Sequence, residues 1–205
     1  MAQSAENIIE LPPPLHKVSV SVEEAMLRLK SVRQYDDTQL DTNTFSQLLW
    51  AAQGVKPPIG KRTAPSAGST YPLEVYAVTG NVEGVTRGIY KYDIQQHRLI
   101  KILDGDFRQA LSAAALGQQS IVQSSFSLVF AAVFERTTAR YGKRGVMYVH
   151  MEAGHAAQNV GLQAVGLGLG TVVIGAFDDG EVSNVLALPQ QEQPLYIIPV
   201  GKPAE

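Results

Sequence analysis

Apolar side chains recur every three or four residues in some segments of the chain and form continuous runs in others. The first pattern is typical of helices that bury one face, and the second of strands covered on both faces. The predicted helices span residues 21–30, 44–53, 106–116, 145–166 and 178–187. The predicted strands span residues 73–79, 88–93, 97–103, 126–134, 171–174 and 195–200. Because 126–134 is an apolar run of strand length, we expect it to be a central strand.

Sequence signals for helix ends accompany the first two helices. Ser21 and Glu24 have the spacing of a capping box, which satisfies free backbone amides at a helix start. Asp41 or Thr42 can cap the second helix, and Gly54 can end it in a left-handed conformation. These residues support both helix predictions.

The longest predicted helix carries small residues along one stripe, at Ala153, Ala157, Gly161 and Ala164. Such a stripe allows something to pack very close to the helix. A flat ring system, another helix or the same helix of a second subunit can each fill that role.

The organisation of the chain follows from its length of 205 residues, which suits one domain with a single sizeable core. Residues 1–20 contain three consecutive prolines, so we expect an extended N-terminal arm. Residues 21–205 should form the folded domain. Within it, residues 56–72 are rich in Pro, Gly, Ser and Thr, which predicts a long structured loop and a first place to look for a site.

Composition excludes several classes of function. A formal net charge of -2 provides no basic face for nucleic acid, so we expect no such partner. With 0 cysteines the chain has no thiolate nucleophile or thiolate metal site, and redox chemistry would need a cofactor. We see no signal-peptide pattern, and the apolar runs fall short of the roughly 20 residues that span a membrane. We therefore expect a soluble, cytoplasmic protein.

Two motif-like patterns lack the context that their chemistry needs. Gly166, Gly168 and Gly170 resemble a dinucleotide loop, but they follow a predicted helix and precede a strand, which is the reverse of the required order. We interpret them as a helix stop and a tight turn. Glu152 and His155 have the spacing of a di-iron ligand pair, but no second such pair occurs. We expect a helical histidine with one satisfied hydrogen bond, and no metal site.

Two remaining segments can bind an anionic, planar ligand. Lys30, Ser31 and Arg33 lie where the first helix should end, and two cations with a hydroxyl between them can bind a phosphate. Residues 65–72 supply small side chains and hydroxyls just before a buried strand, where they can reach the polar edge of a ring. A solvated helix end and a simple turn are the plainer interpretations of these segments.

The order of motifs along nearly the whole chain resembles the nitroreductase superfamily, most closely the branch related to peptide azoline oxidases, called SagB-type dehydrogenases. The motifs that carry the resemblance are residues 31–33 (SVR), 48–54 (LLWAAQG), Arg62 with 65–68 (PSAG), 71–76 (YPLEVY), 90–92 (YKY), 140–142 (RYG), 152–159 (EAGHAAQN), 166–171 (GLGLGT) and 174–177 (IGAF). Each motif is modest alone, and their order makes the resemblance specific.

The resemblance implies an α+β fold with a central, mixed but mainly antiparallel sheet flanked by helices. It also implies a homodimer that holds FMN at the subunit interface. The implied cofactor-binding residues are Lys30, Ser31, Arg33, Pro65, Ser66, Ala67, Ser69, Ile174, Gly175, Ala176 and Lys202. The implied catalytic groups are Arg33 and the backbone of Gly175 and Ala176.

The implied roles agree with flavin chemistry. Lys30 and Ser31 match phosphate-binding positions, and Arg33 matches the cation near the flavin N1 and O2, where a reduced flavin carries negative charge. Ser69 matches a position that faces the pyrimidine edge. The backbone amides of residues 175–176 match those beside N5, the atom that exchanges hydride.

Some positions depart from the family pattern. Leu29 stands where a phosphate-binding arginine is common, with Arg28 as a neighbouring substitute, and Lys202 is the only basic candidate near the end of the sequence. Met147 and Tyr148 align with a Lys-Tyr pair that is implicated in azoline oxidation. Without the lysine, azoline oxidation is not expected.

The resemblance therefore implies that hydride passes from NAD(P)H through FMN to a small acceptor such as a nitroaromatic or a quinone. No separate nicotinamide-binding motif is then required. Two alternatives stay open: a flavin-dependent dehydrogenase or oxidase of a modified peptide or biosynthetic intermediate, and a flavin-binding subunit with little activity of its own.

Overall fold

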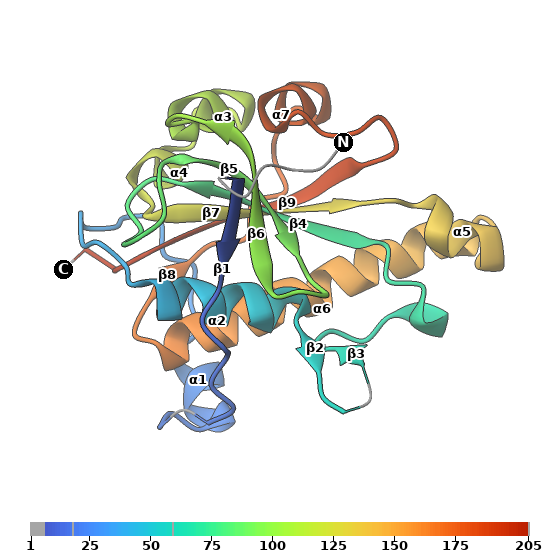
Figure 1. The fold of residues 1–205 in the computed structure, drawn as a ribbon, viewed down its shortest axis with the longest axis horizontal. Helices are drawn as coiled ribbons and strands as arrows, with labels where there is room; N and C mark the ends of the chain where they lie inside the picture. The colour runs from blue at the N-terminus through green and yellow to red at the C-terminus, as the bar shows by residue number, and fades with distance from the viewer. Residues whose placement is uncertain (1–6, 18, 59, 205) are drawn as a thin grey trace.

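The computed structural model describes residues 7–17, 19–58 and 60–204, and it has three layers (Figure 1). The central layer is a seven-stranded sheet in the order β1-β6-β5-β4-β7-β9-β8, in which every neighbouring pair is antiparallel. The strands are β1 (Ile8–Glu10), β4 (Leu73–Thr79), β5 (Gly88–Asp93), β6 (Arg98–Asp104), β7 (Phe126–Ala132), β8 (Gly170–Thr171) and β9 (Gln193–Gly201). The expected α+β fold is confirmed, and β7 is buried along its whole length between β4 and β9.

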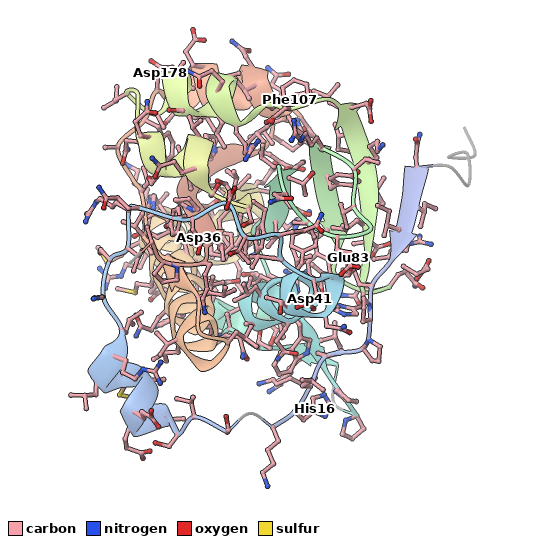
Figure 2. All side chains as sticks on the ribbon, turned by 90° about the vertical axis from the view of Figure 1, so that its left-hand side faces the viewer. His16, Asp36, Asp41, Glu83, Phe107 and Asp178 are labelled. Carbon is pink, nitrogen blue, oxygen red and sulfur yellow. The ribbon has the colours of Figure 1, made fainter. Side chains whose placement is uncertain are left out.

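Helices cover both faces of the sheet. They are α1 (Val22–Arg28), α2 (Thr42–Gln53), α3 (Arg108–Ala114), α4 (Gln119–Gln123), α5 (Glu135–Tyr141), α6 (Arg144–Gly166) and α7 (Asp179–Leu186). In the view of Figure 1, α3, α4 and α7 lie above the sheet, whereas α1, α2 and α6 lie below it. Figure 2 shows the same layers from the side, with Phe107 and Asp178 at the starts of α3 and α7 and Asp41 at the start of α2.

Each face of the sheet has its own hydrophobic core. Below the sheet, Phe45 of α2 packs edge-on against Phe126 of β7, with ring centroids 4.6 Å apart. Above the sheet, Leu111 of α3 and Val182 of α7 are fully buried. Burial of side chains of this size stabilises the fold by about 1.5–3 kcal/mol each, so the two cores hold all three layers together.

The predicted caps of the first two helices are present, but one predicted stop is wrong. The Ser21 hydroxyl accepts a hydrogen bond from the amide of Glu24 at 3.1 Å, and Asp41 caps α2. Gly54 has φ of -61°, which is not left-handed. A Cβ there would lie 2.1 Å from Cδ1 of Trp50, so glycine is needed for a close approach rather than for its backbone freedom.

The stripe of small residues on α6 packs inside its own chain. Ala153, Ala157, Gly161 and Ala164 are all buried. A Cβ on Gly161 would lie 3.2 Å from Cδ1 of Leu29, so the end of α1 fills the space beside the helix. Of the alternatives that the sequence left open, a neighbouring element of the same chain is the one observed.

The structure also contains short elements that hydrophobic periodicity did not predict. They are β1, α4, α5 and a small hairpin of β2 (Val55–Lys56) and β3 (Lys61–Arg62). Each is too short or too polar to show a helical or alternating pattern. The edge strand β1 forms because the chain before the prolines pairs with β6, Ile8 lying opposite Ile100. Within the described ranges, no helix is both long and apolar enough to cross a membrane.

Candidate cofactor and active site

The segment after α1 is fixed against the edge strand β8. Ser31 forms a parallel bridge with Thr171, and the amide of Val32 donates to the Thr171 carbonyl at 2.9 Å. A Cβ on Gly170 would lie 2.7 Å from Val32, so the last glycine of the Gly166–Gly170 turn allows this pairing. The turn links α6 to β8, as interpreted from the sequence. Lys30 and Ser31 therefore lie beside the C-terminal end of α6.

Lys202 joins the same corner of the molecule. Its ammonium donates to the Gly168 carbonyl at 3.3 Å, and its carbonyl accepts from the amide of Asp36 at 3.0 Å. We call Lys30, Ser31, Arg33 and Lys202 the basic corner. Across the described part of the chain, none of its three cations has an ion-pair partner. Uncompensated cations beside a hydroxyl suit a phosphate.

A cavity of about 380 Å³ opens at the basic corner, where Lys30, Gly161, Gly168 and Thr171 line it. Leu29, which stands where the family commonly has an arginine, lines this cavity with its side chain against Gly161. Arg28 also lines the cavity, but it forms an ion pair with Glu24 at 3.0 Å. Arg28 is therefore less available to a ligand than Lys30.

A second cavity of about 560 Å³ contains Gly175. Ile174 is bonded in both directions to Ile197 of β9, at 2.8 and 3.0 Å, which fixes the start of this segment. The amides of Gly175 and Ala176 donate no hydrogen bond to any described residue, whereas the Ala176 carbonyl accepts from Gln118. The Gly175 amide at the cavity and the Ala176 amide next to it can therefore donate to a ligand.

The two cavities lie along one side of α6. Ala153 lines the cavity of Gly175, and Gly161 lines the cavity of the basic corner. Residues four and eight apart share a side of a helix, and eight residues span about 12 Å. Aromatic side chains line the cavity of Gly175, among them Phe134, Phe177 and Tyr196. An elongated ligand with a planar end and an anionic end fits this arrangement.

The 65–72 loop has an unusual backbone that its contacts hold in place. Gly68, Ser69 and Tyr71 have φ of 57°, 56° and 47°, a region that side chains disfavour. The Ser66 hydroxyl accepts from the amide of Tyr71 at 2.9 Å, and Thr70 contacts Thr137 of α5 at 2.8 Å. The loop is thus tied to α5 and keeps a conformation that the chain alone would not favour.

The predicted site residues fall into two groups in this one chain. The basic corner and the segment 174–176 flank the side of α6 that carries the two cavities. The 65–72 loop packs on α5 and the N-terminal half of α6, and Figure 1 shows it at the other end of the molecule from α1 and β8. The structure therefore does not bring Pro65–Ser69 to the basic corner of the same chain.

The residues aligned with the azoline-oxidase pair do not form a catalytic pair. The side chain of Met147 is 45% exposed. Tyr148 packs edge-on against Tyr141, with ring centroids 5.2 Å apart. His155 is exposed and makes no side-chain hydrogen bond to a described residue, so the expectation of one satisfied bond is wrong.

Sequence reasoning missed a buried polar cluster beneath the 65–72 loop. Glu152 is 2% exposed, and burial raises the pKa of its carboxyl to about 7, although the Ser66 hydroxyl and Arg62 act to lower it. Arg62 also donates to Gln53 and to the Leu73 carbonyl. The neighbours of Glu152 on α6 gave a signal, because the positions three before and four after it are apolar and fully buried.

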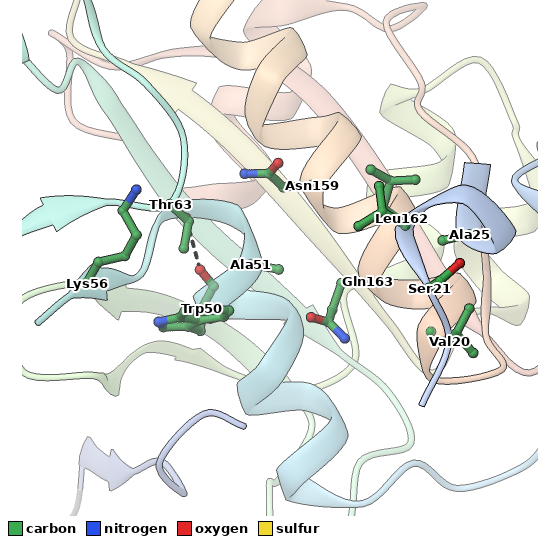
Figure 3. Close-up of a pocket in the computed structure, with 12 residues that line it drawn as sticks. Val20, Ser21, Ala25, Trp50, Ala51, Lys56, Thr63, Asn159, Leu162 and Gln163 are labelled. Atoms are coloured by element: carbon green, nitrogen blue, oxygen red, sulfur yellow. Dashed lines mark hydrogen bonds between the residues drawn. The ribbon is translucent and has the colours of Figure 1, made fainter. Parts of the chain in front are cut away.

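A further cavity of about 360 Å³ lies between α1, α2 and α6 (Figure 3). Trp50, Leu162 and Val20 form its apolar wall, and Asn159 and Gln163 supply amides. The Thr63 hydroxyl, which also lines it, donates a hydrogen bond to the Trp50 carbonyl at 3.1 Å. None of the predicted site residues lines this cavity.

The chain belongs to the nitroreductase family, whose sequence pattern it matches over residues 28–202. A protein of Methanocaldococcus jannaschii with a provisional nitroreductase name is 45% identical over 186 residues, covering 91% of this chain and 93% of that protein. A crystal structure from Ralstonia eutropha, provisionally described as a nitroreductase, has a TM-score of 0.85 at 29% identity, covering 100% of this chain and 93% of that chain.

Two more distant relatives bear on the branch and on the chemistry. The microcin B17-processing protein McbC of Escherichia coli is 27% identical over 162 residues, covering 76% of this chain and 60% of that protein. A Bacillus subtilis protein named as an FMN reductase that uses NAD(P)H is 30% identical over 138 residues, covering 60% of this chain and 55% of that protein. The first supports the predicted branch, and the second supports an oxidoreductase in general terms.

Proposed function

We propose that this protein is an FMN-dependent oxidoreductase that passes hydride from NAD(P)H to a small acceptor such as a nitroaromatic or a quinone. The observation that carries the proposal is the pair of cavities along α6. Cations at one end have no ion-pair partner among the described residues, and two amides at the other end donate to none of them. When bound, FMN would supply the hydride exchange, which no side chain of this cysteine-free protein can provide.

The residues present fit each part of FMN. Lys30, Ser31 and Lys202 would hold the phosphate, because they combine positive charge with a hydroxyl beside a cavity that Lys30 lines. Arg33 is exposed next to them and has no ion-pair partner among the described residues, so it can neutralise charge on the pyrimidine edge. The Gly175 and Ala176 amides would orient the ring at N5.

A homodimer would complete this site. The solvent-facing side of α6 carries Val146, Met147 and Met151, which are 42–48% exposed, and a Cβ on Gly154 would touch nothing within 4 Å. An apolar helix face of this kind suits a subunit contact. Two copies related by a two-fold axis across α6 would place the 65–72 loop of one beside the basic corner of the other.

Equilibrium titration with FMN tests the proposal. Binding should quench the fluorescence of free flavin and give one FMN per chain, and the protein should migrate as a dimer in size-exclusion chromatography with light scattering. No detectable binding with excess FMN would contradict the proposed function, and a monomer that binds FMN tightly would contradict only the shared site.

The similarity to McbC favours one second candidate, a flavin-dependent dehydrogenase of a modified peptide or biosynthetic intermediate. Met147 stands at the position of the azoline-oxidase lysine, so the substrate would differ from an azoline. Loss of the flavin colour on addition of substrate without NAD(P)H would favour this candidate. A bound flavin that neither NADH, NADPH nor a substrate reduces would instead indicate a subunit with little activity of its own.

A further inference from the structure

Three buried polar atoms in the cluster beneath the 65–72 loop have no hydrogen-bond partner among the described residues. They are Oε1 of Glu152, Nε of Arg62 and Nε2 of Gln53. A buried polar group without a partner typically costs about 1–3 kcal/mol, and native proteins keep few of them. Three in one cluster, on three different elements, call for a role that compensates the loss of stability.

The cluster lies directly under the loop whose backbone is least favourable. The Ser66 hydroxyl faces Glu152 and also accepts the Tyr71 amide at 2.9 Å, so a chain of polar contacts runs from α6 to Tyr71. The guanidinium of Arg62 lies 4.7 Å from the centre of the Tyr71 ring. Glu152 therefore acts on the loop in two ways, through the Ser66 hydroxyl and through its charge interaction with Arg62.

We propose that Glu152 is a positioning residue for flavin binding, whose ionised carboxylate holds the 65–72 loop in its flavin-binding conformation through Ser66 and Arg62. This inference rests on the proposed function, in which Pro65, Ser66, Ala67 and Ser69 contact the flavin. Glu152 itself is buried and lines neither of the two cavities along α6, so it acts only through the loop.

Protonation of Glu152 weakens this arrangement. The ionised carboxylate only accepts hydrogen bonds, so it accepts the Ser66 proton while the Ser66 oxygen accepts from Tyr71. A protonated carboxyl offers the Ser66 hydroxyl only a neutral and therefore weaker acceptor, and it loses its attraction to Arg62. Because burial holds the pKa of Glu152 at about 7, this change falls near neutral pH.

The charges around the cluster do not replace Glu152. Arg62 of β3 is the charged group that acts on it, and Gln53 of α2 is neutral. Behind Arg62, Glu74 of β4 favours its charged form, but Arg136 of α5 and Lys91 of β5 occupy that carboxylate in ion pairs at 2.6 and 3.2 Å. Removing the charge of Glu152 therefore leaves Arg62 with one less counter-charge near the loop.

Linkage gives the sign of the effect. The loop contacts favour ionised Glu152, so a flavin that binds the ordered loop should lower the pKa of this carboxyl. The flavin should therefore bind more tightly at a pH above that pKa than below it. With one linked proton, the change cannot exceed about tenfold per pH unit. We expect the dissociation constant to fall by about three- to tenfold between about pH 6 and pH 8.

The test compares FMN and riboflavin binding over this pH range in the full-length protein and in Glu152→Gln. Riboflavin is the decisive probe, because the phosphate of FMN itself titrates near pH 6. Glu192→Gln is the matched control, since Glu192 is also buried but is bonded to Tyr76 and Lys91 at 2.8 Å and not to Ser66. Glu152→Gln should bind riboflavin with the weaker affinity at every pH, and Glu192→Gln should keep the wild-type pH dependence.

Hydrogen–deuterium exchange of the 65–72 segment, corrected for the intrinsic effect of pH, gives a readout that needs no flavin. Its protection should fall on acidification in the wild type and stay low in Glu152→Gln. If Glu152→Gln does not fold, Ser66→Ala interrupts the same chain of contacts and should likewise abolish the pH dependence.

Two results would overturn the role of Glu152 while leaving the proposed function intact. One is riboflavin binding that does not change with pH in the wild type, and the other is an unchanged pH dependence of binding in Glu152→Gln. Absence of FMN binding at every pH would overturn both.

Discussion

The two ends of α6 hold their polar groups in opposite ways. At the C-terminal end, the basic corner keeps Lys30 and Arg33 exposed, where water solvates their charges and folding bears little cost. Toward the N-terminal end, the 65–72 loop covers the buried carboxylate of Glu152 and contains three residues with positive φ. Recognition of a ligand's charge can thus be placed on solvated positions, whereas recognition of its shape depends on conformations that destabilise the fold.

Among substitutions at the basic corner, Arg33→Ala should weaken FMN binding most. A lost hydrogen bond to a charged group costs about 1.5–3 kcal/mol, so FMN should bind about ten- to a hundredfold more weakly. Fluorescence titration measures this change. Arg87→Ala is the matched control, because Arg87 is a solvent-exposed arginine remote from both cavities. Equal losses in the two variants would contradict a specific role for Arg33.

Glu152→Gln should have the largest effect on stability at the buried end, and the sign is opposite to that of most core substitutions. Folding raises the pKa of this carboxyl from 4.5 to about 7, so the unfolded chain loses its proton first and the folded state loses stability as pH rises through this window. The full difference corresponds to at most about 3 kcal/mol, and partial solvent screening reduces it to about 2 kcal/mol.

Urea unfolding should therefore find Glu152→Gln about 2 kcal/mol more stable than the wild type near pH 8 and nearly equal to it near pH 4. Glu192→Gln sharpens the comparison, because it breaks satisfied bonds to Tyr76 and Lys91 and should lower stability near pH 8. A lower stability of Glu152→Gln near pH 8 would show that Glu152 is an ordinary structural carboxylate.

Gly68→Ala should strain the 65–72 loop and weaken FMN binding less than Arg33→Ala does. A Cβ there would lie 2.5 Å from Oη of Tyr141, and φ is +57°. The strain of about 1 kcal/mol predicts about fivefold weaker FMN binding. Gly117→Ala provides the control, because Gly117 has φ of +78° but nothing within 4 Å of its Cβ. If both variants bind FMN as the wild type does, the loop does not contact the cofactor.

The smallest change in FMN binding should come from mixing two variant chains. This experiment tests whether the basic corner of one subunit meets the 65–72 loop of the other across a dimer. In a heterodimer of Arg33→Ala and Gly68→Ala, a shared site collects both defects on one side and leaves the other site with neither. Half of the sites should then bind FMN with wild-type affinity. If each chain builds its own site, no wild-type site should form.

The sequence was informative where a pattern is local. Apolar runs predicted β4 and β7 nearly to the residue, and Lys30, Ser31 and Arg33 could be proposed together because they are neighbours in the chain. The resemblance supplied the remaining site residues. The residue roles that it implies stay predictions.

The rest of the structure depends on contacts that no local pattern encodes. Ser69 and Tyr71 adopt positive φ although their side chains disfavour it, because α5 and Ser66 hold the loop. Gly54 has an ordinary φ and is required by the ring of Trp50. Burial of the ionisable Glu152 opposes the usual preference of carboxylates for water, so tertiary packing alone decides it.

Anaerobic reduction of the FMN-reconstituted protein tests the central claim most directly. NADH or NADPH should bleach the visible absorption of the bound flavin. A quinone or nitroaromatic added afterwards should restore this absorption, with one equivalent of acceptor reduced per flavin. The account would be contradicted if flavin bound at one per chain to the folded protein stayed oxidised with both NADH and NADPH.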